Sequence, residues 1–97
     1  MKLTTLVYGC YDEMRITEYY DGNTAIMLRN GDGEEEPISV NLPNAIHFPS
    51  DKPTFWADTN NCSEAIDQLE RNGVIARGTA EFRSGFCTYP EYEVLGQ

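Results

Sequence analysis

NNCSEAIDQLERNG, residues 60–73, is the stretch that decides the fold, because it is the one convincing amphipathic helix in the chain. Its apolar face at helical spacing consists of Cys62, Ala65, Ile66 and Leu69. Its polar face consists of Ser63, Asp67, Glu70 and Arg71. One face is therefore expected to pack on a sheet while the other faces water.

Both ends of this helix carry recognisable signals. Asn60 or Asn61 can cap its start, and Asn61 with Glu64 has the spacing of a capping-box variant. Gly73 can take the left-handed conformation that ends a helix.

The rest of the chain reads as strands and turns. Strand-like patterns cover residues 3–8, 14–20, 25–29, 38–42, 54–58, 74–83 and 86–95. Asp21-Gly22-Asn23 and Asn30-Gly31-Asp32-Gly33 are turn signals. Pro90 makes the last segment an edge or bulged strand. Residues 43–53, with three prolines and the only histidine, His47, are expected to form a loop.

These elements predict one α+β domain over residues 1–97, an antiparallel meander of about five to six strands with one helix packed on a face. In the core, Ile66 and Leu69 should contact a sheet face that includes Val40 and either Ile26 or Met27.

Acidic residues dominate the charge, with 16 acids against 7 bases and a net charge of −9. The acids are spread along the chain, without an acidic tail. Such a surface repels phosphates and anionic membranes, so neither direct nucleic-acid binding nor membrane binding is expected. It suits a partner with a basic surface, although acids also serve solubility alone.

Three cysteines, Cys10, Cys62 and Cys87, form no close pair. No signal peptide and no apolar run of membrane-spanning length is evident. Free thiols and a cytoplasmic location are therefore expected.

Several short motifs resemble an uncharacterised family of small domain-of-unknown-function proteins from phages and conjugative elements of gut bacteria. The motifs are YDGNTAIML at residues 20–28, ISVNLP at 38–43, LERNGVI at 69–75 and GTAEFRSGF at 78–86. The resemblance covers roughly residues 13–95, and the helix entry and residues 44–55 depart from the pattern. It implies a mobile-element setting in a bacterial host and no catalytic residues. Small acidic proteins of such elements often counter host defences, including CRISPR systems.

No catalytic or metal constellation stands out, and no cofactor is expected. A thiol nucleophile would need a histidine nearby, and zinc would need paired ligand spacings that are missing. Asn30, Asp32 and Glu34 start like a calcium loop, but Glu35 holds the place of the required glycine. The acid pairs in the sequence lie in turns and strand edges, where solvated carboxylates are the default.

The leading hypothesis is a non-enzymatic protein that binds a basic surface of a host protein, for example an anti-CRISPR inhibitor that competes with nucleic acid. Strand tyrosines interleaved with acids favour a docking surface, although tyrosine rings can also simply cover the core with their hydroxyl groups in water. The residues we expect to bind are Glu34, Glu35, Glu36, Asp67, Glu70, Tyr19 and Tyr20. The glutamates should project together from a turn, and the two tyrosines should lie on opposite strand faces.

The main alternative is a small-ligand or nucleotide-signal binding protein, as a monomer or an oligomer, with a pocket lined by Phe55, Trp56, Phe86 and tyrosines. A hydrolase ranks third. The sequence leaves open whether the protein is a monomer or a small homo-oligomer.

Overall fold

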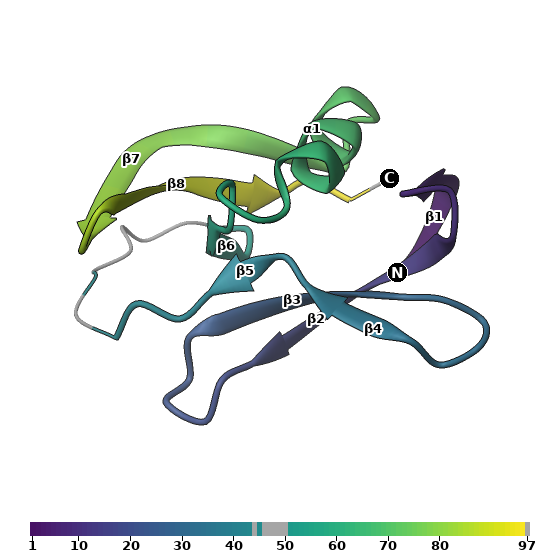
Figure 1. Cartoon of the computed structure of the whole chain (residues 1–97), viewed down its shortest axis with the longest axis horizontal. Helices are drawn as coiled ribbons and strands as arrows, with labels where there is room; N and C mark the ends of the chain where they lie inside the picture. Colours follow the sequence, from purple (N-terminus) through teal and green to yellow (C-terminus); the bar gives the residue numbers. More distant parts are fainter. Residues whose placement is uncertain (44, 46–50, 97) are drawn as a thin grey trace.

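The computed structural model describes residues 1–43, 45 and 51–96, which form two antiparallel four-stranded sheets and one helix (Figure 1). The N-terminal sheet has the order β1-β2-β3-β4, with strands β1 (Lys2–Val7), β2 (Tyr11–Glu18), β3 (Thr24–Arg29) and β4 (Glu35–Pro37). The C-terminal sheet has the order β5-β6-β8-β7, with strands β5 (Ser39–Val40), β6 (Thr54–Ala57), β7 (Ile75–Ser84) and β8 (Cys87–Val94). The helix α1 (Ser63–Arg71) lies between β6 and β7 in the chain.

The expectation of antiparallel strands with one helix is met, but a single meander of five to six strands is wrong. The segment at residues 38–42, expected to be one strand, divides between the two sheets at Ile38. The backbone N–H of Ile38 donates to the carbonyl of Ile26 in β3 at 3.0 Å, while its own carbonyl accepts from the N–H of Asp58, just after β6, at 2.9 Å. One residue is thus hydrogen-bonded to both sheets, and the chain changes sheet there.

Ser39 strengthens this crossing. It is the one buried polar residue identified in the described core, and its hydroxyl accepts from the backbone N–H of Ile26 at 2.9 Å. The hydroxyl of Tyr19 lies 2.9 Å from the same oxygen and donates to the carbonyl of Ser39 at 3.2 Å. A small hydroxyl therefore satisfies a buried backbone donor at the junction of the sheets.

The helix begins without the cap that the sequence suggested. Cys62 is the N-cap residue and makes no side-chain capping bond. Asn61 instead bonds to Asp58, whose carboxylate accepts from its amide at 3.1 Å and from its backbone N–H at 3.3 Å. The asparagine is held by the preceding turn, so its side chain is not available to the helix.

The C-terminal end of the helix agrees with the prediction. Gly73 has a φ of +76°, its N–H donates to the carbonyl of Glu70, and the N–H of Val74 donates to the carbonyl of Leu69. This pair of bonds is the Schellman arrangement, which favours glycine because the left-handed conformation carries no Cβ penalty.

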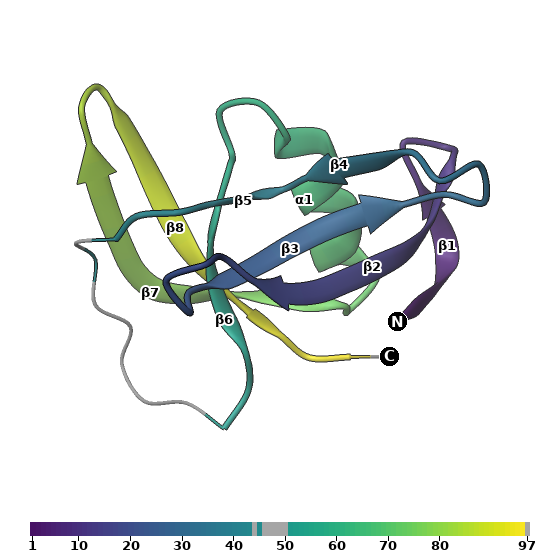
Figure 2. The same cartoon turned by 90° about the horizontal axis from the view of Figure 1, so that it is seen from below.

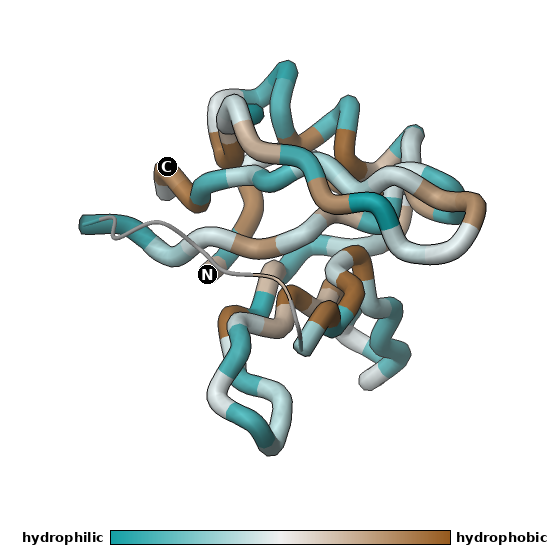
Figure 3. Tube along the Cα trace, turned by 90° about the vertical axis from the view of Figure 1, so that its left-hand side faces the viewer, coloured by the Kyte–Doolittle hydropathy of each residue, from teal (hydrophilic) through white to brown (hydrophobic). Residues whose placement is uncertain are grey.

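The core lies where the helix and the two sheets meet. From α1 it takes Ala65, Ile66 and Leu69, and it includes Val7, Met14, Ile26, Leu28, Ile38, Phe55, Tyr92 and Val94 from both sheets. Ile26 therefore packs in one core with Ile66 and Leu69, as expected, whereas Met27 and Val40 are only half-buried and lie outside it. Every second residue is buried from Pro90 to Val94 in β8, whereas β3 and β6 bury consecutive apolar residues. Figure 3 shows the hydropathy of each residue along the trace.

The β7–β8 hairpin reaches away from the rest of the molecule, at the end opposite β1 (Figure 2). Its register shifts between Arg77 and Glu81, so a bulge is present beside Pro90, but its extra residues lie in β7. The strand that carries Pro90, β8, is an inner strand and not the expected edge. β6 pairs with β8 only from Glu91 to Glu93, which leaves Pro90 just beyond the three-strand region. A residue without an N–H is tolerated there because β6 offers no partner for it.

Replacing Ser39 by alanine should destabilise the fold by about 1–3 kcal/mol, because the buried N–H of Ile26 loses its side-chain acceptor. Urea denaturation would measure the change. The matched control is Ser63→Ala on the exposed face of α1, expected to stay within about 0.5 kcal/mol. Equal stability of the two variants would contradict the role given to Ser39.

Leu69→Ala should destabilise by about 2–4 kcal/mol, because it removes a fully buried side chain where the helix meets both sheets. Leu6→Ala is the control, since Leu6 is 51% exposed. A melting temperature unchanged by Leu69→Ala would contradict the packing of the helix on the two sheets.

Candidate interaction surface

The three glutamates at residues 34–36 do not project together. The side chain of Glu35 faces β2, where Arg15 donates to it at 3.0 Å. Glu36 faces the start of the helix, where the thiol of Cys62 donates to its carboxylate at 3.9 Å. Successive side chains of an extended strand point to opposite faces, which separates neighbours in the sequence.

Four acids lie around the group formed by Tyr8, Tyr11 and Cys62, and we call them the acidic rim: Glu34, Glu36, Asp58 and Glu64. They come from the turn before β4, from β4, from the loop after β6 and from the first turn of the helix. Glu36 links them, because its charge acts on Tyr8, Tyr11 and Cys62 alike. Glu64 also acts on Tyr8, Glu34 on Tyr11 and Asp58 on Cys62. The tertiary structure thus joins acids that lie up to 30 positions apart in the sequence.

Hydrogen bonds of Tyr8 connect the β1–β2 turn to the helix α1. Its backbone N–H donates to the side-chain oxygen of Gln68 at 3.0 Å, and its hydroxyl is hydrogen-bonded by the backbone of Ala65. Its φ of +54° lies in the left-handed region, which is costly for a bulky side chain. Tyr11 packs edge-on against the ring of Tyr8, with centroids 6.4 Å apart. Both rings are thereby held in place beside the rim.

Burial, and then the negative charge of the rim, raises the pKa values of Tyr8, Tyr11 and Cys62. Burial raises the pKa of Tyr8, Tyr11 and Cys62, and in each of them the charge of Glu36 raises the pKa further. Nearby negative charge disfavours ionisation of a phenol or a thiol, so all three groups stay neutral at ordinary pH.

The ion pairs found among residues 1–43, 45 and 51–96 use other acids. Lys2 lies 3.6 Å from Asp12, Arg15 lies 3.0 Å from Glu35, and Arg77 lies 2.7 Å from Glu81. None of these three pairs involves the rim. Its negative potential is therefore available to a partner in solution.

Asp67 and Glu70 are exposed on α1, as predicted. The carboxylate of Glu70 accepts from the hydroxyl of Tyr92 at 3.3 Å. Burial, followed by the charge of Glu70, raises the pKa of Tyr92. These acids form a second, smaller acidic area on the helix.

Tyr19 and Tyr20 lie beyond the end of β2, so they are not strand residues on opposite faces. Tyr19 is half-buried and serves the sheet junction through Ser39. Tyr20 is fully exposed in the hairpin turn. The tyrosines beside the acids are Tyr8 and Tyr11, which were not among the residues expected to bind.

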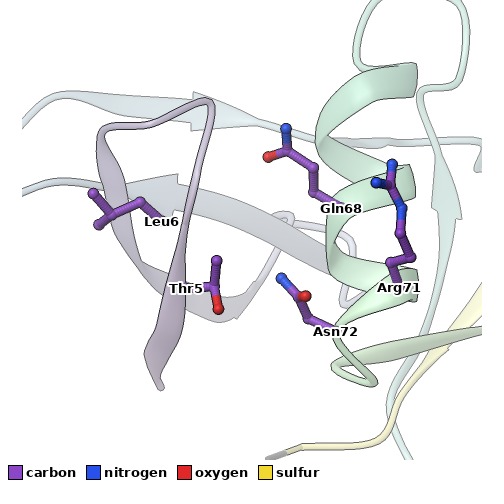
Figure 4. Close-up of a pocket in the computed structure, with 5 residues that line it drawn as sticks. All are labelled: Thr5, Leu6, Gln68, Arg71 and Asn72. Carbon is purple, nitrogen blue, oxygen red and sulfur yellow. The ribbon is translucent and has the colours of Figure 1, made fainter.

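The aromatic pocket expected for a small ligand is not formed by Phe55, Trp56 and Phe86. Phe55 and Trp56 are buried, whereas Phe86 is fully exposed at the tip of the β7–β8 hairpin. A different hollow of about 240 Å³ lies between β1 and the end of α1, lined by Thr5, Leu6, Gln68, Arg71 and Asn72 (Figure 4). It is smaller than most ligand pockets, which occupy roughly 300–1,000 Å³.

The remaining sequence expectations concern thiols, metals and the membrane. Cys10, Cys62 and Cys87 are free. Among the described residues, no group of three or more histidine, cysteine or acidic side chains is placed to hold a metal ion, and no helix is long and apolar enough to span a membrane. The calcium-like turn is closed internally, because the side-chain oxygen of Asn30 accepts from the N–H groups of Asp32 and Glu34. His47 lies outside the described residues.

No protein-family model, curated protein or solved structure matches this chain. The resemblance to small proteins of phages and conjugative elements accordingly stays a prediction.

The free energy of unfolding should fall as the pH rises from about 9 to about 11. The pKa of Cys62 is raised from 9.0 to about 11 in the folded chain, mainly by burial, so the unfolded chain loses this proton first. The stabilisation is complete below pH 9 and lost once the folded thiol also ionises. Urea titrations across this range should give a shallower fall for Cys62→Ala than for Cys10→Ala. Equal slopes would contradict the assignment to Cys62.

Proposed function

We propose that this chain is a non-enzymatic interaction protein whose acidic rim binds a basic surface of another protein. The observation that carries the proposal is the gathering of four acids from separate segments around Cys62 and the two fixed tyrosines, Tyr8 and Tyr11. The three ion pairs that neutralise acids elsewhere do not reach this surface. Acids that gather with no ion pair found among the described residues favour a positively charged partner.

The tyrosines add a physical reason for this choice of surface. Tyrosine is enriched among the residues that dominate binding energy at protein interfaces. Tyr8 and Tyr11 are already ordered by contacts to Gln68, Ala65 and each other. Side chains that are fixed before binding lose less conformational entropy when a partner covers them.

The partner we favour is a host protein that itself binds nucleic acid, because such proteins display basic channels shaped for phosphates. Carboxylates of the rim would occupy phosphate positions and so compete with DNA or RNA. An anti-CRISPR or other anti-defence protein, acting in the bacterial cytoplasm, is the concrete form of this proposal, and the motif resemblance supports the setting. The small-ligand alternative has less support, since its aromatic residues do not converge.

Reversing Glu34 and Glu64 to lysine should weaken binding to a basic partner by about tenfold or more, because it changes the charge of the rim by four units. Both side chains are exposed, and each loses one exposed hydrogen bond, Glu34 with Asn30 and Glu64 with Gln68, so the change in stability should stay small. The probe is a purified RNA-guided nuclease complex, with binding followed by interferometry at low and high salt. Wild-type binding should weaken steeply as salt screens the charges.

The matched control reverses Glu18 and Asp51, two exposed acids that line a different hollow. It has the same net charge as the rim variant, so only the position of the change differs. Binding that ignores salt and survives the rim reversal would make the acidic-surface hypothesis wrong. A wild-type protein that binds no such complex would remove the anti-defence version of the proposal.

A further inference from the structure

The strand β7 is the outermost strand of its sheet and the longest of the described strands, with 10 residues. It pairs with β8 on one side, and its other edge follows the outside of the projecting hairpin (Figures 1 and 2). An outer edge of this length presents backbone donors and acceptors to any strand that can align with it.

The backbone bonds fix which residues face outward at the start of β7. The N–H of Leu95 donates to the carbonyl of Val74 at 2.8 Å, so Val74 faces β8. Because backbone groups alternate along a strand, those of Ile75 and Arg77 point to the open side.

Beyond the bulge, the pairing with β8 again fixes which residues of β7 face outward. Ser84 lies opposite Cys87 across the two-residue hairpin turn, which makes them a hydrogen-bonded pair, and Arg83 therefore faces outward. Glu81 lies opposite Pro90, which has no N–H to offer, so it also faces outward. The outward residues on both sides of the bulge are thus odd-numbered, and they can pair with an identical strand about a twofold axis.

The charges on this edge, together with the length of the overlap, favour one register. With the axis at Thr79, Arg77 of each copy lies opposite Glu81 of the other, and Ile75 lies opposite Arg83. With the axis at Ala80, Arg77 lies opposite Arg83 and the like charges repel. With the axis at Gly78, Arg77 lies opposite Thr79 and no charge pair forms. Opposite charges across a strand pair stabilise it, and like charges destabilise it.

We propose that two copies of this chain associate edge to edge through β7, antiparallel, with Arg77 of each copy paired to Glu81 of the other. The occupant of the edge is a second copy because the charge pattern is complementary to itself. The axis at Thr79 pairs residues 75–83, whereas an axis at Phe82, which places Glu81 opposite Arg83, overlaps only over residues 80–84. β7 carries Arg77, Arg83 and Glu81, a local charge of +1 in a chain of net charge −9, so the copies meet away from their acidic rims.

The bulge shapes this interface. Residues 78–80 lie opposite one residue of β8, and a Cβ at Gly78 would come within 3.3 Å of the carbonyl oxygen of Glu91. The new ladder therefore forms as two short stretches, one on each side of the bulge, and the strands cross at Thr79. Within one chain the guanidinium of Arg77 lies 2.7 Å from Glu81, and both side chains are about half exposed. They can exchange this contact for the equivalent one across the axis.

The test is sedimentation velocity over a wide range of protein concentration, with two single reversals, Arg77→Glu and Glu81→Arg. Wild type should shift from 11.0 kDa toward twice that mass as concentration rises. Each reversal alone places like charges opposite one another and should weaken association at least tenfold. An equimolar mixture of the two variants restores both opposite-charge pairs and should associate as wild type does. Contacts within one chain cannot produce this recovery.

The matched control is the exposed pair Arg15 and Glu35, which lies on the other sheet. Arg15→Glu and Glu35→Arg, alone or mixed, should leave the sedimentation of the protein unchanged, and circular dichroism would verify that every variant is folded. A wild-type monomer at all concentrations would overturn the proposal. So would association that survives both β7 reversals, or a mixture of them that fails to associate.

Discussion

The backbone of Ile38 is the interaction on which the rest of the structure depends. Its N–H is bonded to β3 of one sheet and its carbonyl to Asp58 beside β6 of the other. Neither four-stranded sheet could bury enough apolar surface alone, because a small sheet leaves both faces near water. The crossing at Ile38 holds the two sheets where α1 can cover both. The hydroxyl of Ser39 removes the cost of burying the polar backbone at that point.

The acidic rim follows from the same crossing. β4 ends one residue before Ile38, which places Glu36 beside the start of α1. The carbonyl of Ile38 holds Asp58 at the entry to the helix, and Glu64 follows in the first helical turn. Carboxylates near a helix N-terminus are favoured by its exposed N–H groups, which lowers the cost of gathering them. The constraint that joins the sheets therefore also concentrates negative charge.

The acidic rim and the charged outer edge of β7 lie on separate parts of the surface. The rim lies near the β1–β2 turn and the start of the helix, whereas β7 carries its charges on the projecting hairpin. A protein with excess charge of one sign is kept apart from its own copies by repulsion unless their contact avoids that charge. Association through β7 would leave both rims free, so a dimer would present the same acidic surface twice. Two linked sites raise the avidity for a partner that offers two basic patches.

Local patterns in the sequence determined the helix, its end at Gly73, its buried face and most strands, because these depend on periodicity and on the backbone freedom of single residues. The free thiols were also foreseen from cysteine usage. Only the tertiary structure decided that the strand at residues 38–42 divides between two sheets, that Asn61 bonds Asp58 instead of capping the helix, and that Glu35 and Glu36 face opposite ways. Each of these outcomes depends on partners distant in sequence. Local periodicity carries no information about hydrogen-bond competition or about strand pairing at long range. The sequence alone therefore could not predict that the acids of the rim lie close together.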